Sequence, residues 1–280
     1  KFDNLEISAN GDFIYSNKRR KGLTVTRLED KSSQFYPQPK TCEYVVVKGG
    51  IISFKIGMKS TPVLWSSDFN QQLSTFHQLA GMNNCLSVSD EVIACIYDQK
   101  HVTFFNVSTK QIVHEMSSDE QYLSVHACSI KYHVLTGSGH RKFLWKNGKK
   151  IDAWTNIFSL AAIEDIYKAE FSPEGNTLVV SSKDIQKLFI FDVLSTSMLA
   201  QISFDGDLIG GLKFLDEKNV ICSFLETIYC VNVERGEILA SLNIGIWPSP
   251  ISICRKNNII CAGLHRSGDL QLLEVILPRM

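Results

Sequence analysis

One pattern of apolar and polar segments occurs seven times in this sequence of 280 residues, at intervals of about forty residues. Each repeat has an apolar run, a polar turn, a second run with small residues, another turn and a third run. The seven blocks span residues 5–29, 43–67, 85–107, 128–147, 169–193, 212–233 and 251–275. Regular self-similarity of this length is typical of repeat folds, in which one unit cannot bury its apolar faces without its neighbours.

The third run of each block favours a β-strand. Runs such as Val102-Thr103-Phe104-Phe105 and Leu188-Phe189-Ile190-Phe191 are β-branched and aromatic, too short for helices, and bounded by turn residues. A fourth, weaker run follows most blocks, as at residues 111–116, 198–204 and 237–244. The pattern therefore predicts an all-β, seven-bladed β-propeller. An antiparallel sandwich is the alternative, but a sandwich gives no reason for the turn order to repeat.

Some blocks carry the local signature of a known family. Phe171-Ser172-Pro173-Glu174-Gly175 forms an expected turn between first and second strands, and Phe191-Asp192-Val193 and Phe105-Asn106-Val107 end third strands. In these features the chain resembles the WD-repeat propellers, whose blades usually end the third strand in Trp-Asp. The resemblance is degenerate, because neither Trp65 nor Trp145 is followed by Asp. It implies a propeller that holds protein partners.

The predicted domain is a single propeller over residues 1–280, with blades at approximately 1–40, 41–80, 81–122, 123–165, 166–207, 208–247 and 248–280. The last blade has little sequence left for a fourth strand after residue 275. An unpaired outer edge is a liability that propellers normally remove by joining the first and last blades. We therefore expect the chain to be part of a longer polypeptide or complex, with a three-stranded last blade as the alternative.

The composition limits which cellular compartment and which classes of partner we expect. The 29 lysines and arginines balance 29 acidic residues, which argues against a general nucleic-acid coat and makes nucleic acid an unexpected partner. No apolar run approaches the roughly 18 residues of a membrane helix, and no secretory leader follows Lys1, so no membrane is expected. The eight cysteines show no C-x-x-C pattern and lie mostly in apolar runs. They are interpreted as reduced core thiols of a cytoplasmic or nuclear protein.

Aromatic residues in three expected inter-blade loops are candidates for partner binding, because aromatics on rigid loops dominate interface energies. They are Tyr36, Phe158 and Trp247. On this hypothesis Phe158→Ala and Trp247→Ala weaken partner binding and leave thermal unfolding nearly unchanged. In the alternative interpretation these side chains fold back and seal the core.

Basic residues in the expected loops between second and third strands are a second set of candidates, either for a partner or for phosphate. They are Lys18, Arg19, Arg20, Lys21, Arg141 and Lys142. Acidic residues from inter-blade loops share the same face, so the charges there neutralise one another to a large extent. A solvated hairpin tip is the alternative reason for the Lys18–Lys21 run.

No catalytic or cofactor motif occurs in the sequence, and the seven histidines are scattered over different blocks. His126-x-Cys128 is the nearest approach to metal-ligand spacing, and without a second pair it is a weak signal. We predict a non-catalytic protein-interaction scaffold with no metal and no cofactor. Two narrower roles stay open: a regulatory propeller similar to those of apoptosome-type NTPases, and a substrate-recognition propeller similar to those of ubiquitin-ligase adaptors. A hydrolase with a site in the central channel is a third hypothesis.

Overall fold

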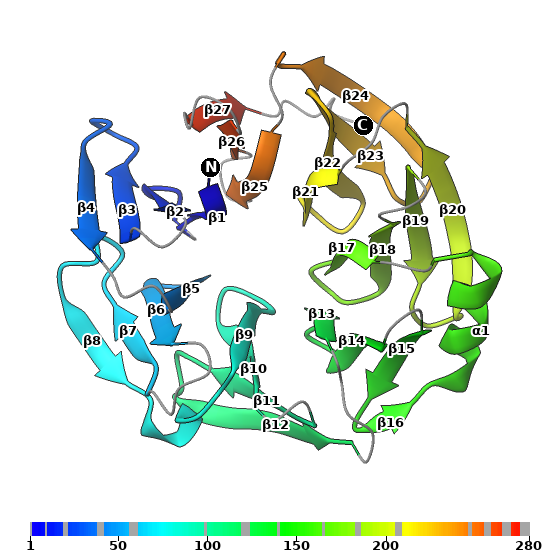
Figure 1. Ribbon diagram of the computed structural model, residues 1–280, viewed down its shortest axis with the longest axis horizontal. Helices are drawn as coiled ribbons and strands as arrows, with labels where there is room; N and C mark the ends of the chain where they lie inside the picture. Colours follow the sequence, from blue (N-terminus) through cyan, green and yellow to red (C-terminus); the bar gives the residue numbers. More distant parts are fainter. Residues whose placement is uncertain are drawn as a thin grey trace.

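A computed structural model describes residues 2–274, apart from residues 9, 19–21, 38–41, 56–60, 98–99, 119–123, 139–140, 164–165, 183–185, 205–208, 246–247, 255–258 and 265–269. The described residues form antiparallel sheets in which strands follow one another in chain order, from the centre of the molecule outward (Figure 1). No helix in the described part of the chain has the length and apolar character needed to cross a membrane.

The strands of the first four sheets are β1 (Phe2–Ile7), β2 (Phe13–Lys18), β3 (Gly22–Arg27) and β4 (Ser33–Pro37); β5 (Cys42–Val47), β6 (Gly50–Lys55), β7 (Val63–Trp65) and β8 (Gln72–Thr75); β9 (Asn84–Ser87), β10 (Val92–Ile96), β11 (His101–Asn106) and β12 (Gln111–Ser117); and β13 (Ser124–Cys128), β14 (His133–Ser138), β15 (Arg141–Lys146) and β16 (Lys149–Lys150). A short 3-10 helix, His77–Leu79, follows β8.

The remaining sheets contain β17 (Ile166–Phe171), β18 (Thr177–Ser182), β19 (Lys187–Asp192) and β20 (Ser197–Ser203); β21 (Ile209–Phe214), β22 (Asn219–Phe224), β23 (Thr227–Asn232) and β24 (Glu237–Asn243); and β25 (Pro248–Cys254), β26 (Ile259–Leu264) and β27 (Leu270–Glu274). Six sheets therefore have four strands, whereas the last has three among the described residues. The prediction of seven blades is corrected accordingly: the molecule has six complete blades, and the three-stranded sheet stands in the place of a seventh.

The sheets stand radially around a central axis, and the first strand of each sheet lies innermost (Figure 1). Alternate side chains of a strand point to opposite faces, so each sheet buries one face against the preceding sheet and one against the next. Leu135 and Leu144 of one blade thus pack in one cluster with Leu178, Phe189 and Phe191 of the next. This apolar packing between sheets, which the third-strand runs supply, is the core of the molecule.

The first and last sheets meet through their inner strands, because β1 lies beside β25 (Figure 1). The backbone N–H of Ile7 donates a hydrogen bond to Ser252 Oγ at 2.9 Å, and the Ser252 hydroxyl donates to Glu6 Oε2 at 3.2 Å. Residues separated by about 245 positions in sequence are therefore bonded directly at this junction.

The fourth blade departs from the repeat, because its outer strand β16 has two residues and is followed by helix α1 (Asp152–Leu160). Trp154 and Phe158 are one helical turn apart, and both side chains are buried against Phe191 of the fifth blade. The expectation that Phe158 lies on an exposed inter-blade loop is thus corrected: its side chain is 2% exposed and belongs to the core.

Gly148 explains how the chain turns ahead of α1. It has φ +74°, and a Cβ added there would lie 2.6 Å from the carbonyl oxygen of Ser117 in β12. Only glycine fits both this backbone conformation and this close approach between neighbouring blades.

Candidate functional site

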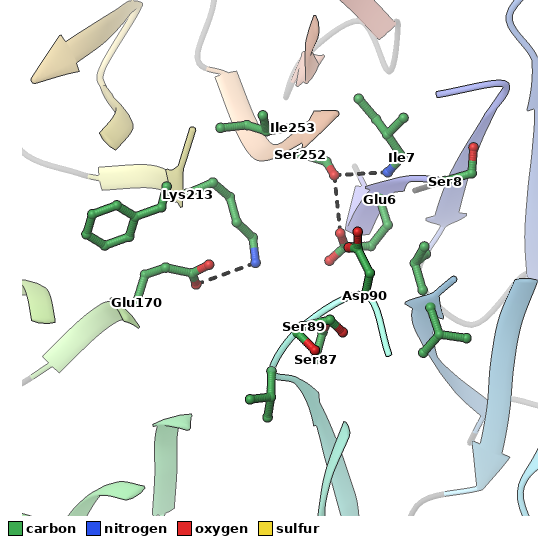
Figure 2. A pocket seen from close by; sticks show the side chains of 14 residues that line it. Glu6, Ile7, Ser8, Ser87, Ser89, Asp90, Glu170, Lys213, Ser252 and Ile253 are labelled. Atoms are coloured by element: carbon green, nitrogen blue, oxygen red, sulfur yellow. Dashed lines mark hydrogen bonds and ion pairs between the residues drawn. The ribbon is translucent and has the colours of Figure 1, made fainter. Parts of the chain in front are cut away.

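The central axis of the ring holds a cavity of about 150 Å³, lined mainly by the inner strands (Figure 2). The first strand of each sheet lies nearest the axis, and several of these strands place side chains there. They include Glu6 from β1, Glu170 from β17, Lys213 from β21 and Ser252 from β25. The opposite wall holds Val46, Val47, Ser87 and Val88, together with the acidic Asp90. We call this space the axial channel.

The wall of the axial channel carries three carboxylates, Glu6, Asp90 and Glu170, and one lysine, Lys213. Lys213 Nζ lies 3.5 Å from Glu170 Oε2, and Ser252 donates to Glu6 (Figure 2). Lys168 of β17 lies close enough to these groups for their charges to act on it. Desolvation lowers the pKa of Lys168, and the neighbouring Lys213 ammonium lowers it further, while Glu170 and Glu6 oppose the change. The channel therefore holds one ion pair beside two further carboxylates, so acidic groups outnumber basic groups along its lining.

A second cavity of about 230 Å³ shares Glu6, Glu170 and Lys213 with the axial channel and adds His126 and Cys128. Burial raises the pKa of the Cys128 thiol well above its usual range, so that thiol stays protonated and is a poor nucleophile or metal ligand. Among the described residues, no three metal-ligating side chains come together. A ligand of metabolite size usually occupies 300–1,000 Å³, so the axial channel suits a single inserted side chain better than a small-molecule substrate.

A larger hollow of about 930 Å³ lies on the face where first strands turn into second strands. Its lining residues are Asn10, Lys48, Gly49, Ser67, Val88, Ser89, Asp90, Glu91, Val92, Asn106, Ile130 and Pro173. They come from the first five blades. We call it the first-turn depression. It shares Val88, Ser89 and Asp90 with the axial channel, which places the two side by side.

Contacts between blades hold the rim of the first-turn depression. Lys48 Nζ, from the turn after β5, lies 2.7 Å from Glu91 Oε1 in the turn after β9. The hydrogen bond and the negative charge of Glu91 both raise the pKa of Lys48. Within the depression Val88 and Val92 are part-exposed and Ile130 is 42% exposed. A partly exposed aliphatic surface is therefore surrounded by polar residues, and an ion pair links two of the surrounding turns.

Tyr36 lies on outer strand β4 and not in an inter-blade loop, which corrects its expected position. Its hydroxyl lies 3.0 Å from the carbonyl oxygen of Asp68, to which it donates, and 2.5 Å from Asn70 Oδ1. Its ring packs edge-on against Phe69 at 5.0 Å. Burial raises the pKa of the Tyr36 phenol. This tyrosine joins the first two blades, and its role in partner binding stays a prediction.

The three basic candidates that the structure describes, Lys18, Arg141 and Lys142, all belong to strands. Lys142 is 4% exposed within β15, which corrects its expected place on a loop surface. Lys18 ends β2 and Arg141 begins β15, so both belong to strands. Arg19, Arg20, Lys21 and Trp247 lie outside the described residues. Partner binding by Lys18 and Arg141 stays a prediction.

The sequence predicted the turns between first and second strands, but it did not predict that these turns line a common depression. The available signal was the aliphatic Ile130 beside Ser129 and Lys131, in a segment where polar residues are usual. Inspection of each turn in isolation cannot reveal the depression, because five blades contribute to it.

Comparisons with solved structures agree with the fold. The β-propeller domain of Cps50 (Swd1) from Myceliophthora thermophila superimposes with a TM-score of 0.66 at 13% identity, over 97% of this chain and 96% of that one. The C-terminal WD40 domain of Sif2 gives 0.59 at 12% identity, over 98% and 81%. No family model matches the sequence, and no curated protein matches it significantly. The chain is thus an all-β propeller with WD40 domains among its structural neighbours.

Proposed function

We propose that this chain is a non-catalytic scaffold that binds a segment of a partner protein in the first-turn depression. The observation that carries the proposal is an aliphatic surface around Ile130, inside a polar rim, in a hollow of about 930 Å³. Exposed apolar side chains on rigid turns, surrounded by polar groups, are the usual arrangement of a protein-binding site.

The adjoining axial channel supports the same proposal. Lys213 and Glu170 form an ion pair in the channel, and its Ser252 hydroxyl is bonded to a carboxylate and a backbone N–H. Such a wall can receive one polar side chain of a bound segment by exchanging hydrogen bonds. A partner would therefore lie across the depression and insert one residue towards the axis.

The five described free cysteines, Cys85, Cys95, Cys128, Cys222 and Cys230, are all buried thiols. They support our proposal of a reducing compartment, cytoplasm or nucleus. The two narrower roles named above stay predictions that the flanking sequence tests: a nucleotide-binding domain for the NTPase propeller, an F-box motif for the ligase adaptor.

Site-specific photo-crosslinking in cells tests the proposed surface. A photoreactive residue replaces Ile130 in the depression, and in a matched control it replaces Leu199, which is 48% exposed on outer strand β20. We expect a discrete set of protein adducts from position 130 that is absent at position 199. Ile130→Asp should abolish capture of the same proteins and leave the melting temperature within about 2 °C, because surface substitutions are usually worth less than about 0.5 kcal/mol.

Equal adducts at both positions would contradict the proposal, since binding would then be unspecific. A large fall in melting temperature in Ile130→Asp would also contradict it, because Ile130 would then be part of the packed structure.

A further inference from the structure

Three lysines of the fourth blade lie beside the first-turn depression without acidic partners. Lys131 follows Ile130 in the turn after β13, and Lys146 and Lys149 flank the turn between β15 and β16. Lys146 and Lys149 are exposed, and Lys131 is part-exposed. In the described part of the chain, no ion pair joins any of the three to an acidic residue, and Asp152 at the start of α1 is no exception. We call these three residues the lysine row.

The turn between β15 and β16 holds two members of the lysine row side by side. Its central residues Asn147 and Gly148 have φ of 48° and 74°, and two successive positive values are typical of a tight hairpin turn. Lys146 and Lys149 therefore pair directly across the two strands. Like charges in this position repel each other and destabilise the hairpin. An anion bound from outside would relieve that repulsion.

Backbone pairing connects the lysine row to the depression. His133 at the start of β14 lies opposite Lys146 in the sheet. The turn that carries Ile130 and Lys131 begins at Ser129, whose backbone N–H donates to the carbonyl oxygen of His133 at 2.9 Å. Ile130 and the lysine row are thus presented by one hydrogen-bonded end of the same sheet.

The two neighbouring blades fix the turn after β13. On one side, the ring of Tyr132 stacks on His114 of β12 with the ring centroids 4.3 Å apart. On the other side, Lys131 Nζ donates to Asn176 Oδ1 in the turn after β17. The amide of Asn176 also donates to Glu174 Oε2 at 3.1 Å. The carboxylate of Glu174 therefore reaches Lys131 only through a neutral amide.

The electrostatic potential beside this turn is positive. Burial is the main cause that lowers the pKa of His133, and the charges of Lys146 and Lys131 lower it further. Paired residues of neighbouring strands project to the same face of a sheet, so Lys146 and Lys149 lie on the face from which His133 stacks on Phe171 of the fifth blade. The lysine row therefore borders the junction between the fourth and fifth blades, whose turns contribute Ile130 and Pro173 to the depression.

We propose that the partner segment in the first-turn depression is acidic, with an aliphatic residue on Ile130 and neighbouring carboxylates on the lysine row. This inference rests on the proposed function and adds the charge of the partner to it. Complementary charges around an apolar contact orient a partner and exclude segments of the wrong charge. Exposed ion pairs are individually weak, so the segment needs several carboxylates. A neutral or basic segment would leave the repulsion between Lys146 and Lys149 in place.

Crosslinking from position 130 tests the charge of the segment as well as its presence. The crosslinked peptides are sequenced by mass spectrometry, and we expect Asp and Glu to outnumber Lys and Arg in the residues that flank each adduct. Lys146→Glu combined with Lys149→Glu should lower the adduct yield about tenfold, because it reverses two of the three charges. Lys146→Gln combined with Lys149→Gln should give a smaller loss, because it removes these charges without reversing them.

A lysine elsewhere on the molecule is the control for these variants. Lys31 is exposed in the corresponding turn of the first blade, between β3 and β4, and Lys31→Glu should leave the adduct yield unchanged. All the substituted lysines are exposed, so each variant should keep its melting temperature within about 2 °C.

Salt dependence separates an electrostatic role from a structural one. With a partner purified after its identification, the affinity of the unaltered chain should fall about tenfold between about 0.05 M and about 0.5 M salt, because salt screens exposed charges. The variant with Lys146→Gln and Lys149→Gln should lose most of this dependence.

The outcomes distinguish this proposal from the proposed function. Specific adducts at position 130 whose segments are neutral or basic would overturn the acidic partner and leave the proposed function intact. Adduct yields that charge reversal leaves unchanged would do the same, as would an equal loss in Lys31→Glu. A lack of specific adducts at position 130 would overturn both proposals.

Discussion

His133 shows how one buried side chain couples the fold to pH. It is 2% exposed at the start of β14, its Nδ1 lies 3.1 Å from Ser129 Oγ, and its ring stacks on Phe171. Burial lowers the pKa of this imidazole to about 4, and the positive charges of Lys146 and Lys131 act in the same direction. The folded state therefore holds His133 neutral at pH values where an unfolded chain would protonate it.

We expect the free energy of unfolding to fall as the pH is lowered from about 6.5 towards 4. In this window the unfolded state binds the proton and the folded state does not, so the proton favours unfolding; above pH 6.5 the contribution is fully retained. The loss attributable to His133 is on the order of 3 kcal/mol at pH 4. Urea denaturation at pH 7.5, 5.5 and 4.5 measures it, with His133→Phe as the comparison. An equally steep loss in His133→Phe would show that other groups cause it.

Helix α1 replaces most of a fourth strand in the fourth blade. Its contacts show how a helix can fill the junction with the fifth blade. Trp154 and Phe158 project from one side of the helix, with ring centroids 5.4 Å apart, and Phe158 lies 5.5 Å from Phe191. Leu160, at the end of the same helix, is 87% exposed. The helix thus has one side that fills the junction with the fifth blade and one that faces solvent.

Phe158→Ala should lower the free energy of unfolding by about 3–5 kcal/mol, because it removes a buried ring and leaves a cavity. Leu160→Ala, on the solvent side of the same helix, should change it by less than about 0.5 kcal/mol. This reverses the expectation from sequence that Phe158→Ala leaves unfolding unchanged. Thermal and urea unfolding measure both variants, and equal effects in the two would contradict the packing described here.

At the scale of the whole molecule, the ring depends on the junction between its first and last sheets. Ser252 is buried and bonds both the backbone N–H of Ile7 and the carboxylate of Glu6. Ser181 makes a similar pair of hydrogen bonds, but with the N–H and the carbonyl oxygen of Lys168 in its own blade. The two serines therefore have comparable local roles, and only one of them joins the ends of the ring.

Ser252→Ala should cost about 1–3 kcal/mol, because it leaves the buried N–H of Ile7 without its partner. Ser181→Ala should cost less, because the N–H of Lys168 is only part-buried. Only Ser252→Ala should open the ring, seen as faster hydrogen exchange in β1 and β25 at denaturant concentrations that leave β18 protected. Global unfolding without this local opening in Ser252→Ala would contradict closure through the inner strands.

The strands and their turns follow from the sequence alone, because hydrophobic alternation and turn residues are local properties. Runs such as Leu188–Phe191, which are buried in β19, already specify a radially packed sheet. The first-turn depression does not follow from local pattern, because its lining residues come from five blades.

The tertiary structure alone decided which side chains are buried and how many blades are complete. The apolar residues around Phe158 were compatible with burial and with binding, and the position of Phe191 in the next blade selects burial. Likewise the absence of a fourth described strand beside β27 depends on pairing and not on composition. Local sequence determines how a segment can fold, whereas exposure depends on neighbours that are distant in the chain, such as Ile7 and Ser252.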